Sequence, residues 1–353
     1  MKFWILKKPI IEQATLSEDI FMKMVRYATL AAALGFLGMS GLTAAQEVTL
    51  RASGSFQPDH SSSLAMERFR DSVAERTNGE VRIDLFPSNQ LGGASQQVDQ
   101  VRRGSIFMSW SGPSFWTGVV PEIEALSLPF VLPDPESAFN LVDGPLGGIL
   151  SEGFEERNVI ALGWGDLGAR HVTNSRRALN SVEDFNGLRI RMQPNEVHLS
   201  TFRALGANPA PLDIAELFSA LQQGVMDGQE NPYSITLTNR FQEIQGHLSD
   251  TAHFYDYVVY LVNKEAFEGL DPEYQEAIRT SMEEAIEWQR SYNQEANEAA
   301  LEELIEAGMT FTPISDELRD EMREMTSGVI DDVRARIGSD LVDMVLEEAG
   351  VEQ

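Results

Sequence analysis

Residues 271–308 read DPEYQEAIRTSMEEAIEWQRSYNQEANEAALEELIEAG. Asp271 is a typical residue to cap the start of a helix, Pro272 suits the first helical position, and Gly308 suits a helix stop. No other proline or glycine interrupts the segment. It therefore predicts one helix over 272–307, about 54 Å long at 1.5 Å per residue, which is rare in globular proteins.

This predicted helix has two apolar patches, at Ile278, Met282 and Ile286 and again at Leu301, Leu304 and Ile305. A dimeric coiled coil would need apolar residues sustained along the helix, and residues 287–299 lack them. The pattern favours a single helix that runs under two separate domains, and we expect a monomer.

The chain before the helix alternates strands and helices. Strands are predicted at 48–52, 81–86, 106–110, 159–164, 188–192 and 257–263, with helices between them. This rhythm is typical of α/β domains with largely parallel sheets. The length of 353 residues and the 42% hydrophobic content agree with two such domains.

The N-terminal segment has the features of a signal peptide. Lys23 and Arg26 precede the uncharged residues 28–42, and Thr43-Ala44-Ala45 supplies small residues for cleavage after Ala45. The apolar run is shorter than the roughly 20 residues that a membrane-spanning helix needs, and no later stretch is long and apolar enough to span a bilayer. We expect export to the periplasm.

Composition excludes several classes of function. With 55 acidic against 27 basic residues, the net charge of −28 argues against nucleic acid as a partner. The absence of cysteine excludes disulfides, thiolate metal sites and cysteine nucleophiles. The five histidines lack metal-ligand spacing, so we expect no metal and no cofactor. A G-x-G-x-x-G match at 163–168 precedes a predicted strand instead of the helix that a dinucleotide site requires.

In so acidic a chain, an anionic ligand must be held by local arginines. Arg170 follows a glycine-rich turn, and Arg191 lies near the carboxyl end of strand 188–192, where α/β folds bind ligands. A guanidinium group binds a carboxylate through two parallel hydrogen bonds. The alternative is that both arginines are ordinary surface residues. The alternation of side chains along a strand does not separate Arg189 from Arg191, because both fall on the same face.

Two runs of sequence, LGANPAP at 205–211 and ALQQGVMDGQENP at 220–232, resemble the solute-binding subunits of TRAP (tripartite ATP-independent periplasmic) transporters, the DctP family. FPSNQLG at 86–92, FNGLRIR at 185–191, LPF at 128–130 and residues 241–253 also match. The resemblance covers essentially the whole mature chain.

The resemblance implies a two-lobed α/β fold that closes on an organic acid and delivers it to the membrane subunits of a transporter, without catalysis. We expect a leader over 1–45, a first lobe over 46–167 plus 257–296, and a second lobe over 168–256 plus 297–353. The long helix would span both lobes.

By motif, the resemblance assigns the carboxylate-binding arginine to Arg191. It assigns a second cleft arginine to Arg170 and the cleft asparagine to Asn231. Members that bind sialic acids carry an acidic residue where this chain has Gly112, which argues against a sialic acid here.

Five further residues are candidates, each with an alternative role. Trp110 and Trp164 end predicted strands, where they would face a ligand or pack in the core. His60 and Asn195 would contact the ligand or cap helices, and Asp256 would meet a ligand hydroxyl group.

Two classes of function remain open. One is a binding protein for an organic acid, with sugar acids, C4-dicarboxylates and aromatic acids all possible. The other is a secreted hydrolase or lyase that acts on an acidic sugar with paired carboxylates. No acid–base pair or nucleophile stands out near the arginines, so the sequence favours binding.

Overall fold

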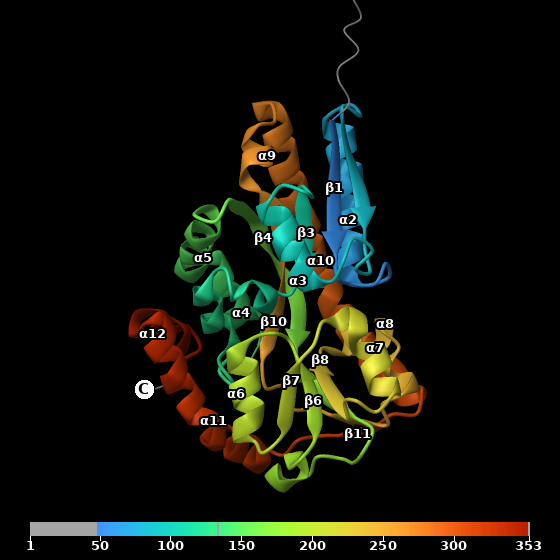
Figure 1. Ribbon diagram of the computed structural model, residues 1–353, viewed down its shortest axis with the longest axis vertical. Coiled ribbons are helices and arrows are strands. Elements are labelled where there is room, and N and C mark those ends of the chain that lie inside the picture. The colour runs from blue at the N-terminus through green and yellow to red at the C-terminus, as the bar shows by residue number, and fades with distance from the viewer. Residues whose placement is uncertain (1–47, 133, 352–353) are drawn as a thin grey trace, which may run out of the picture. The chain divides into compact units, whose positions relative to one another are not determined.

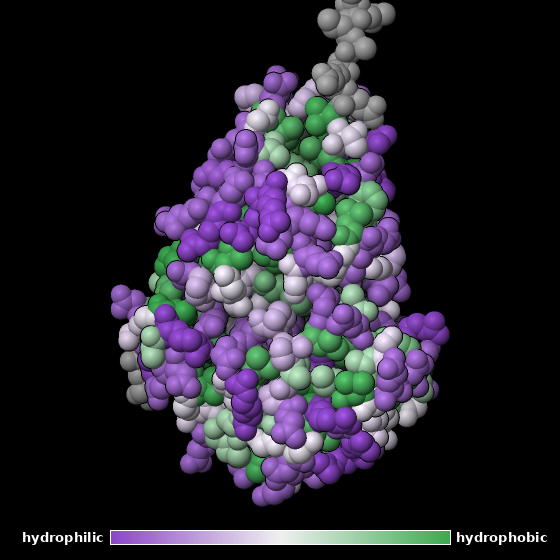
Figure 2. Space-filling model, in the orientation of Figure 1, coloured by the Kyte–Doolittle hydropathy of each residue, from purple (hydrophilic) through white to green (hydrophobic). Residues whose placement is uncertain are grey.

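The computed structural model describes residues 48–132 and 134–351 (Figure 1). The predicted signal peptide lies outside the described residues. Within the described part of the chain, no helix has both the length and the apolar character that crossing a membrane requires. The face seen in Figure 2 is mainly hydrophilic, and its hydrophobic residues occur in small groups.

The first lobe is built on a five-stranded sheet of order β2-β1-β3-β10-β4. Strands β1 to β3 are parallel, as the alternation predicts, whereas β10 is antiparallel to both of its neighbours. The strands are β1 (Val48–Gly54), β2 (Val81–Phe86), β3 (Met108–Ser111), β4 (Val159–Ala169) and β10 (Tyr255–Asn263). The helices are α2 (Ser61–Arg76), α3 (Ala94–Arg102), α4 (Pro135–Asp143), α5 (Pro145–Glu155) and α9 (Lys264–Glu268).

The second lobe is built on a six-stranded sheet of order β11-β9-β5-β8-β6-β7. Its strands are β5 (His171–Asn174), β6 (Arg189–Met192), β7 (Asn208–Pro211), β8 (Gly228–Asn231), β9 (His247–Ser249) and β11 (Thr310–Thr312). Its helices are α6 (Glu196–Ala204), α7 (Ile214–Gln222) and α8 (Tyr233–Thr238). In each lobe, loops at the carboxyl ends of parallel strands can carry ligand groups.

Two antiparallel strands connect the lobes. β4 and β10 pair from Val159 opposite Asn263 to Ala169 opposite Tyr255. At the end of this ladder, the backbone N–H of Arg170 donates to the carbonyl of Phe254 at 2.9 Å, and the chain continues into β5. The ladder therefore carries the chain from the first sheet to the second.

The long helix α10 (Pro272–Glu306) confirms the predicted single helix to within one residue. It contacts α2 and β4 of the first lobe and α8 of the second (Figure 1). Its polar middle is partly buried: Gln289 donates to the carbonyl oxygen of Asp166 and accepts from its N–H, both at 2.7 Å. Asn297 likewise donates to the carbonyl oxygen of Leu167 at 2.9 Å. The helix is polar in its middle because it bonds the β4 backbone there.

The C-terminal helices depart from the expected lobe boundaries. α11 (Asp316–Ile337) begins in the second lobe, where Leu318 packs in that core. Its later residue Val333 joins the core of the first lobe, as does Val345 of α12 (Ser339–Glu348). The expected placement of all of 297–353 in the second lobe is therefore corrected, because α11 is long enough to reach both cores.

Candidate ligand-binding site

A small cavity, with about 20 Å³ of free space in this conformation, lies where the two lobes meet. The first lobe contributes residues that follow β1 and β3 and one near the end of β4, and the second contributes β6, β8 and the first residues of α7 and α8. The lining residues are Ser55, Phe56, Gly112, Phe115, Leu167, Arg191, Gln193, Ile214, Asn231 and Ile235.

Arg191 supplies the cationic group of this cavity. β6 buries its side chain to 1% exposure, and its Nε donates to the carbonyl oxygen of Leu212 at 2.7 Å. Both Nη atoms are buried without a hydrogen-bond partner. Loss of hydration lowers the pKa of Arg191 to about 10, although nearby Glu230 favours the charged form. A buried guanidinium with an unused pair of donors is a site for an anion.

The structure separates Arg191 from its neighbour Arg189. The Arg189 guanidinium donates to Asp227 at 2.9 Å from Nε and 2.7 Å from Nη2, and it is partly exposed to solvent. Asp227 stands just before β8, beside the start of β6. Arg189 is therefore paired on the surface, which strand alternation alone left open.

Arg170 lies outside the lining of the cavity, in a buried ionic cluster. Its Nη2 donates to Glu230 Oε1 at 2.8 Å, to the Glu230 carbonyl at 2.6 Å and to Asn231 Oδ1 at 3.1 Å. Its Nε and Nη1 donate to the carboxylates of Glu230 and Asp256. These two carboxylates raise the pKa of Arg170 despite its burial. The cluster joins the β4–β5 connection to β8 and β10, so it braces the point where the chain passes between lobes.

Asn231 and Asp256 contact this cluster from different positions. Asn231 lines the cavity as the motif predicts, but its Oδ1 is already occupied by Arg170. Asp256 does not line the cavity; its Oδ2 accepts from Arg170 and, at 3.1 Å, from Nε2 of Gln193. Burial raises the pKa of Asp256, and Arg170 opposes that shift.

Gln193 is a lining residue that the sequence reasoning missed. Its Nε2 is held by Asp256, and its Oε1 is buried without a partner. A Cβ atom at Gly112 would lie 3.1 Å from that oxygen, so the two lobes approach closely here. The spacing could have identified Gln193, because residues two apart on an extended strand share a face and Arg191 was already a candidate.

The two tryptophans correct the sequence prediction, because neither lines the cavity. Trp110 is fully buried against the β1 backbone: a Cβ at Gly54 would lie 1.9 Å from its Cε2. Trp164 packs on Phe154 and Tyr257, with ring centroids 6.3 and 6.2 Å away. Both rings are held in the core of the first lobe, as the alternative role predicts.

His60 and Asn195 cap helices, which confirms their alternative role. His60 Nδ1 accepts from the Ser62 N–H at the start of α2, and burial lowers the pKa of His60 to about 3. Asn195 accepts from the N–H of Val197 at 2.8 Å at the start of α6. Its Nδ2 also donates to Ser114 Oγ at 3.2 Å, so it bonds the second lobe to the first.

The lobes are in contact on either side of the cavity. Asp213 caps α7 through Oδ1, which accepts from Ala215 N–H at 3.1 Å, while Oδ2 accepts from the Ser95 N–H of α3 at 3.3 Å. Elsewhere, Gln57 Nε2 donates to Asn239 Oδ1 at 3.1 Å. The described conformation is therefore a closed one.

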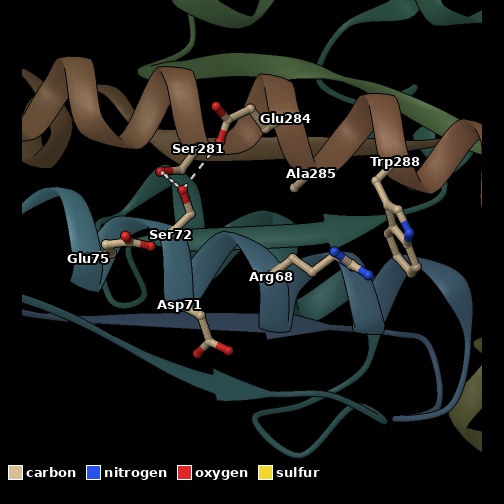
Figure 3. Close-up of a pocket in the computed structure, with 8 residues that line it drawn as sticks. All are labelled: Arg68, Asp71, Ser72, Glu75, Ser281, Glu284, Ala285 and Trp288. Carbon is tan, nitrogen blue, oxygen red and sulfur yellow. Dashed lines mark hydrogen bonds between the residues drawn. The ribbon is translucent and has the colours of Figure 1, made fainter.

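A second hollow, between α2 and α10, is an open groove (Figure 3). Its polar groups bond one another: Ser281 donates to Ser72 at 2.9 Å, and the Arg68 guanidinium lies 4.1 Å from the centre of the Trp288 ring. It offers no buried, unpartnered charge like that of Arg191. The described residues contain no group of side chains suited to hold a metal ion.

Two α/β lobes that meet over a cavity with an unpartnered arginine are typical of the class of solute-binding proteins that close around a ligand. Residues 52–336 match the sequence profile of DctP, bacterial extracellular solute-binding protein family 7, and the chain belongs to that family. The resemblance to TRAP solute-binding subunits and the predicted fold class are confirmed.

Named relatives and solved structures agree with this assignment. The 2,3-diketo-L-gulonate-binding periplasmic protein YiaO of Escherichia coli K12 is 33% identical over 310 residues, 86% of this chain and 94% of the relative. The sugar acid binding protein DctPAm of Advenella mimigardefordensis with galactonate has a TM-score of 0.85 and 29% identity, over 86% of this chain and 98% of that one. A TRAP solute binding protein of Sulfurospirillum deleyianum with succinate has a TM-score of 0.82 and 27% identity, over 85% and 98%.

Proposed function

We propose that this protein captures an organic acid in the periplasm and delivers it, as a monomer and without chemical change, to the membrane subunits of a TRAP transporter. The observation that carries the proposal is the buried Arg191 guanidinium, whose Nη atoms lack partners beside the cavity. A carboxylate would satisfy both donors and the charge at once. The ligands named for the relatives, 2,3-diketo-L-gulonate, galactonate and succinate, all carry carboxylates.

We further propose that the two lobes close around the ligand. Arg191 belongs to the second lobe, whereas Phe56 and Phe115 reach the cavity from the first. A ligand that touches both sides favours the closed state over an open one. The connecting β4–β10 ladder and α10 would stay intact during this motion, because the backbone of β4 is bonded to both.

The experiment is calorimetric titration with a panel of organic acids, followed by two matched variants. Arg191→Lys keeps the charge but loses the planar fork, and charged hydrogen bonds are worth about 1.5–3 kcal/mol each. We expect it to weaken binding about ten- to a hundredfold, while Arg189→Lys leaves affinity nearly unchanged. Unchanged affinity in Arg191→Lys would reject the carboxylate clamp.

Scattering measurements on the wild type test closure separately. The radius of gyration should fall when a bound acid is added, because the open fraction is depleted. Tight binding with no change in the radius of gyration would reject hinged closure but would not contradict carboxylate binding by Arg191.

The alternative, a hydrolase or lyase, would need two carboxylates at the cavity. The buried carboxylates of Glu230 and Asp256 are outside its lining and bonded to Arg170. We therefore favour binding without catalysis. Recovery of the acid unchanged after prolonged incubation with the protein would support this, and a new product would overturn it.

A further inference from the structure

The cavity has few polar atoms without a partner. Apart from the two Nη atoms of Arg191, the lining side chains leave only Gln193 Oε1 and Ser55 Oγ buried and unpartnered. A bound ligand gains most where it satisfies such groups, because an unpaired buried polar group costs about 1–3 kcal/mol. These atoms therefore set the polar pattern of the ligand.

The lining has one cationic group among the described residues. Arg170 is the other buried arginine nearby, and its guanidinium is bonded to Glu230, Asp256 and Asn231. A second carboxylate on the ligand would therefore find no free cation in the cavity. This favours a monocarboxylate over a dicarboxylate.

The remaining walls of the cavity are mostly apolar. Phe56, Phe115 and Leu167 stand on the first lobe, and Ile214 and Ile235 stand on the second. A sugar acid would bring several hydroxyl groups against these side chains, and each hydroxyl buried without a partner carries a free-energy cost. An apolar ligand body fits both walls better.

Gln193 specifies the polar group next to the carboxylate. Its Nε2 donates to Asp256, which is itself bonded to Arg170, so Oε1 is the end that is left without a partner. An amide oxygen accepts hydrogen bonds and cannot donate them. Gln193 and Arg191 both line the cavity, so this oxygen and the guanidinium belong to the same site. A hydroxyl group beside the carboxylate could donate to it, whereas a ketone oxygen could not.

We propose that the ligand is a 2-hydroxy monocarboxylic acid with a branched or aromatic apolar body, and that Gln193 selects the hydroxyl over the 2-oxo form. The inference rests on the proposed function, since it takes Arg191 as the carboxylate site. It adds the ligand's second polar group and the character of its body.

The test is calorimetric titration of the exported chain with four acids: 2-hydroxy-3-methylbutanoate, its 2-oxo counterpart, succinate and galactonate. The 2-hydroxy acid should bind at least about tenfold more tightly than each of the others, because each competitor leaves a buried polar group unpaired. Gln193→Met removes the acceptor and should bring the hydroxy-to-oxo ratio close to one. Gln96→Met, at an exposed position on α3, is the matched control and should keep the wild-type ratio.

The outcomes separate this inference from the proposed function. If succinate or galactonate binds more tightly than the 2-hydroxy acid, or if the wild type does not distinguish the hydroxy and oxo forms, the inference is overturned and carboxylate capture stands. If none of the four acids nor any other carboxylate binds, both fail. A Gln193→Met variant that keeps the wild-type ratio would remove the role assigned to Gln193.

Discussion

Replacement of Arg191 by methionine should make the ligand-free protein more stable while it abolishes carboxylate binding. The guanidinium is buried with both Nη atoms unpartnered, and its pKa is lowered to about 10 by lost hydration. At about 1.4 kcal/mol per pH unit, this displacement corresponds to roughly 3 kcal/mol of unfavourable burial of charge. Methionine fills similar space without a charge, but the bond from Nε to the Leu212 carbonyl is lost, which costs about 1 kcal/mol. The expected net gain is about 2 kcal/mol.

The assay is the free energy of unfolding in urea at pH 7, measured without ligand for the wild type, Arg191→Met and Arg189→Met. Arg189 is the matched control, because its guanidinium is paired with Asp227 and its replacement should bring no gain. A loss of more than about 1 kcal/mol in Arg191→Met would refute the reasoning, since it would mean that the guanidinium is well satisfied in the empty protein. Retained carboxylate binding in that variant would mean that another group holds the anion.

Two further predictions concern closure and pH. A Cβ at Gly93 would lie 2.6 Å from Asp213 Oδ2, so Gly93→Ala should hinder closure and weaken ligand binding severalfold. Gly118→Ala is the control, because a Cβ there meets open space and should leave affinity unchanged. Equal affinities of the two variants by calorimetry would contradict this prediction. Burial lowers the pKa of His198 to about 3 in the folded protein. As pH falls below about 6.5, this histidine is therefore protonated in the unfolded chain but not in the folded one, and the free energy of unfolding decreases. Between pH 7 and 5, His198→Phe should therefore lose about 2 kcal/mol less unfolding free energy than the wild type, and identical losses in urea titrations would reject the assignment.

The elements that the sequence predicted well are those whose ends are signalled by residues of the element itself. α10 carries its own start at Asp271 and its stop near Gly308, so its bounds need no knowledge of the rest of the fold. Arg191 was predicted because a strand's carboxyl end and a motif coincide, and the structure places it in the lining of the cavity. The two tryptophans were misplaced because β3 is buried throughout and β4 along much of its length, so alternation does not tell which face of the sheet a side chain takes.

The role of Arg170 was beyond sequence reasoning for a different reason. Its carboxylate partners are 60 and 86 residues away in the chain, and they meet it only because β5 pairs with β8 while β10 returns beside β4. Neither strand pairing has a local signature. A cationic residue near a ligand site looks the same in the sequence whether its charge is free or neutralised, so only the neighbouring strands decide which arginine can bind an anion.

The polar middle of α10 shows how one feature serves both the fold and the proposed motion. Gln289 and Asn297, eight residues apart on one helix face, bond the backbone of β4 at Asp166 and Leu167. A Cβ at the preceding residue, Gly165, would lie 2.5 Å from Gln289 Oε1, so this stretch of β4 is fixed against the helix. In the proposed closure, this stretch of β4 and α10 would therefore move as one unit. The Arg170 guanidinium is already paired with the carboxylates of Glu230 and Asp256, which leaves Arg191 as the cation that we propose the ligand completes.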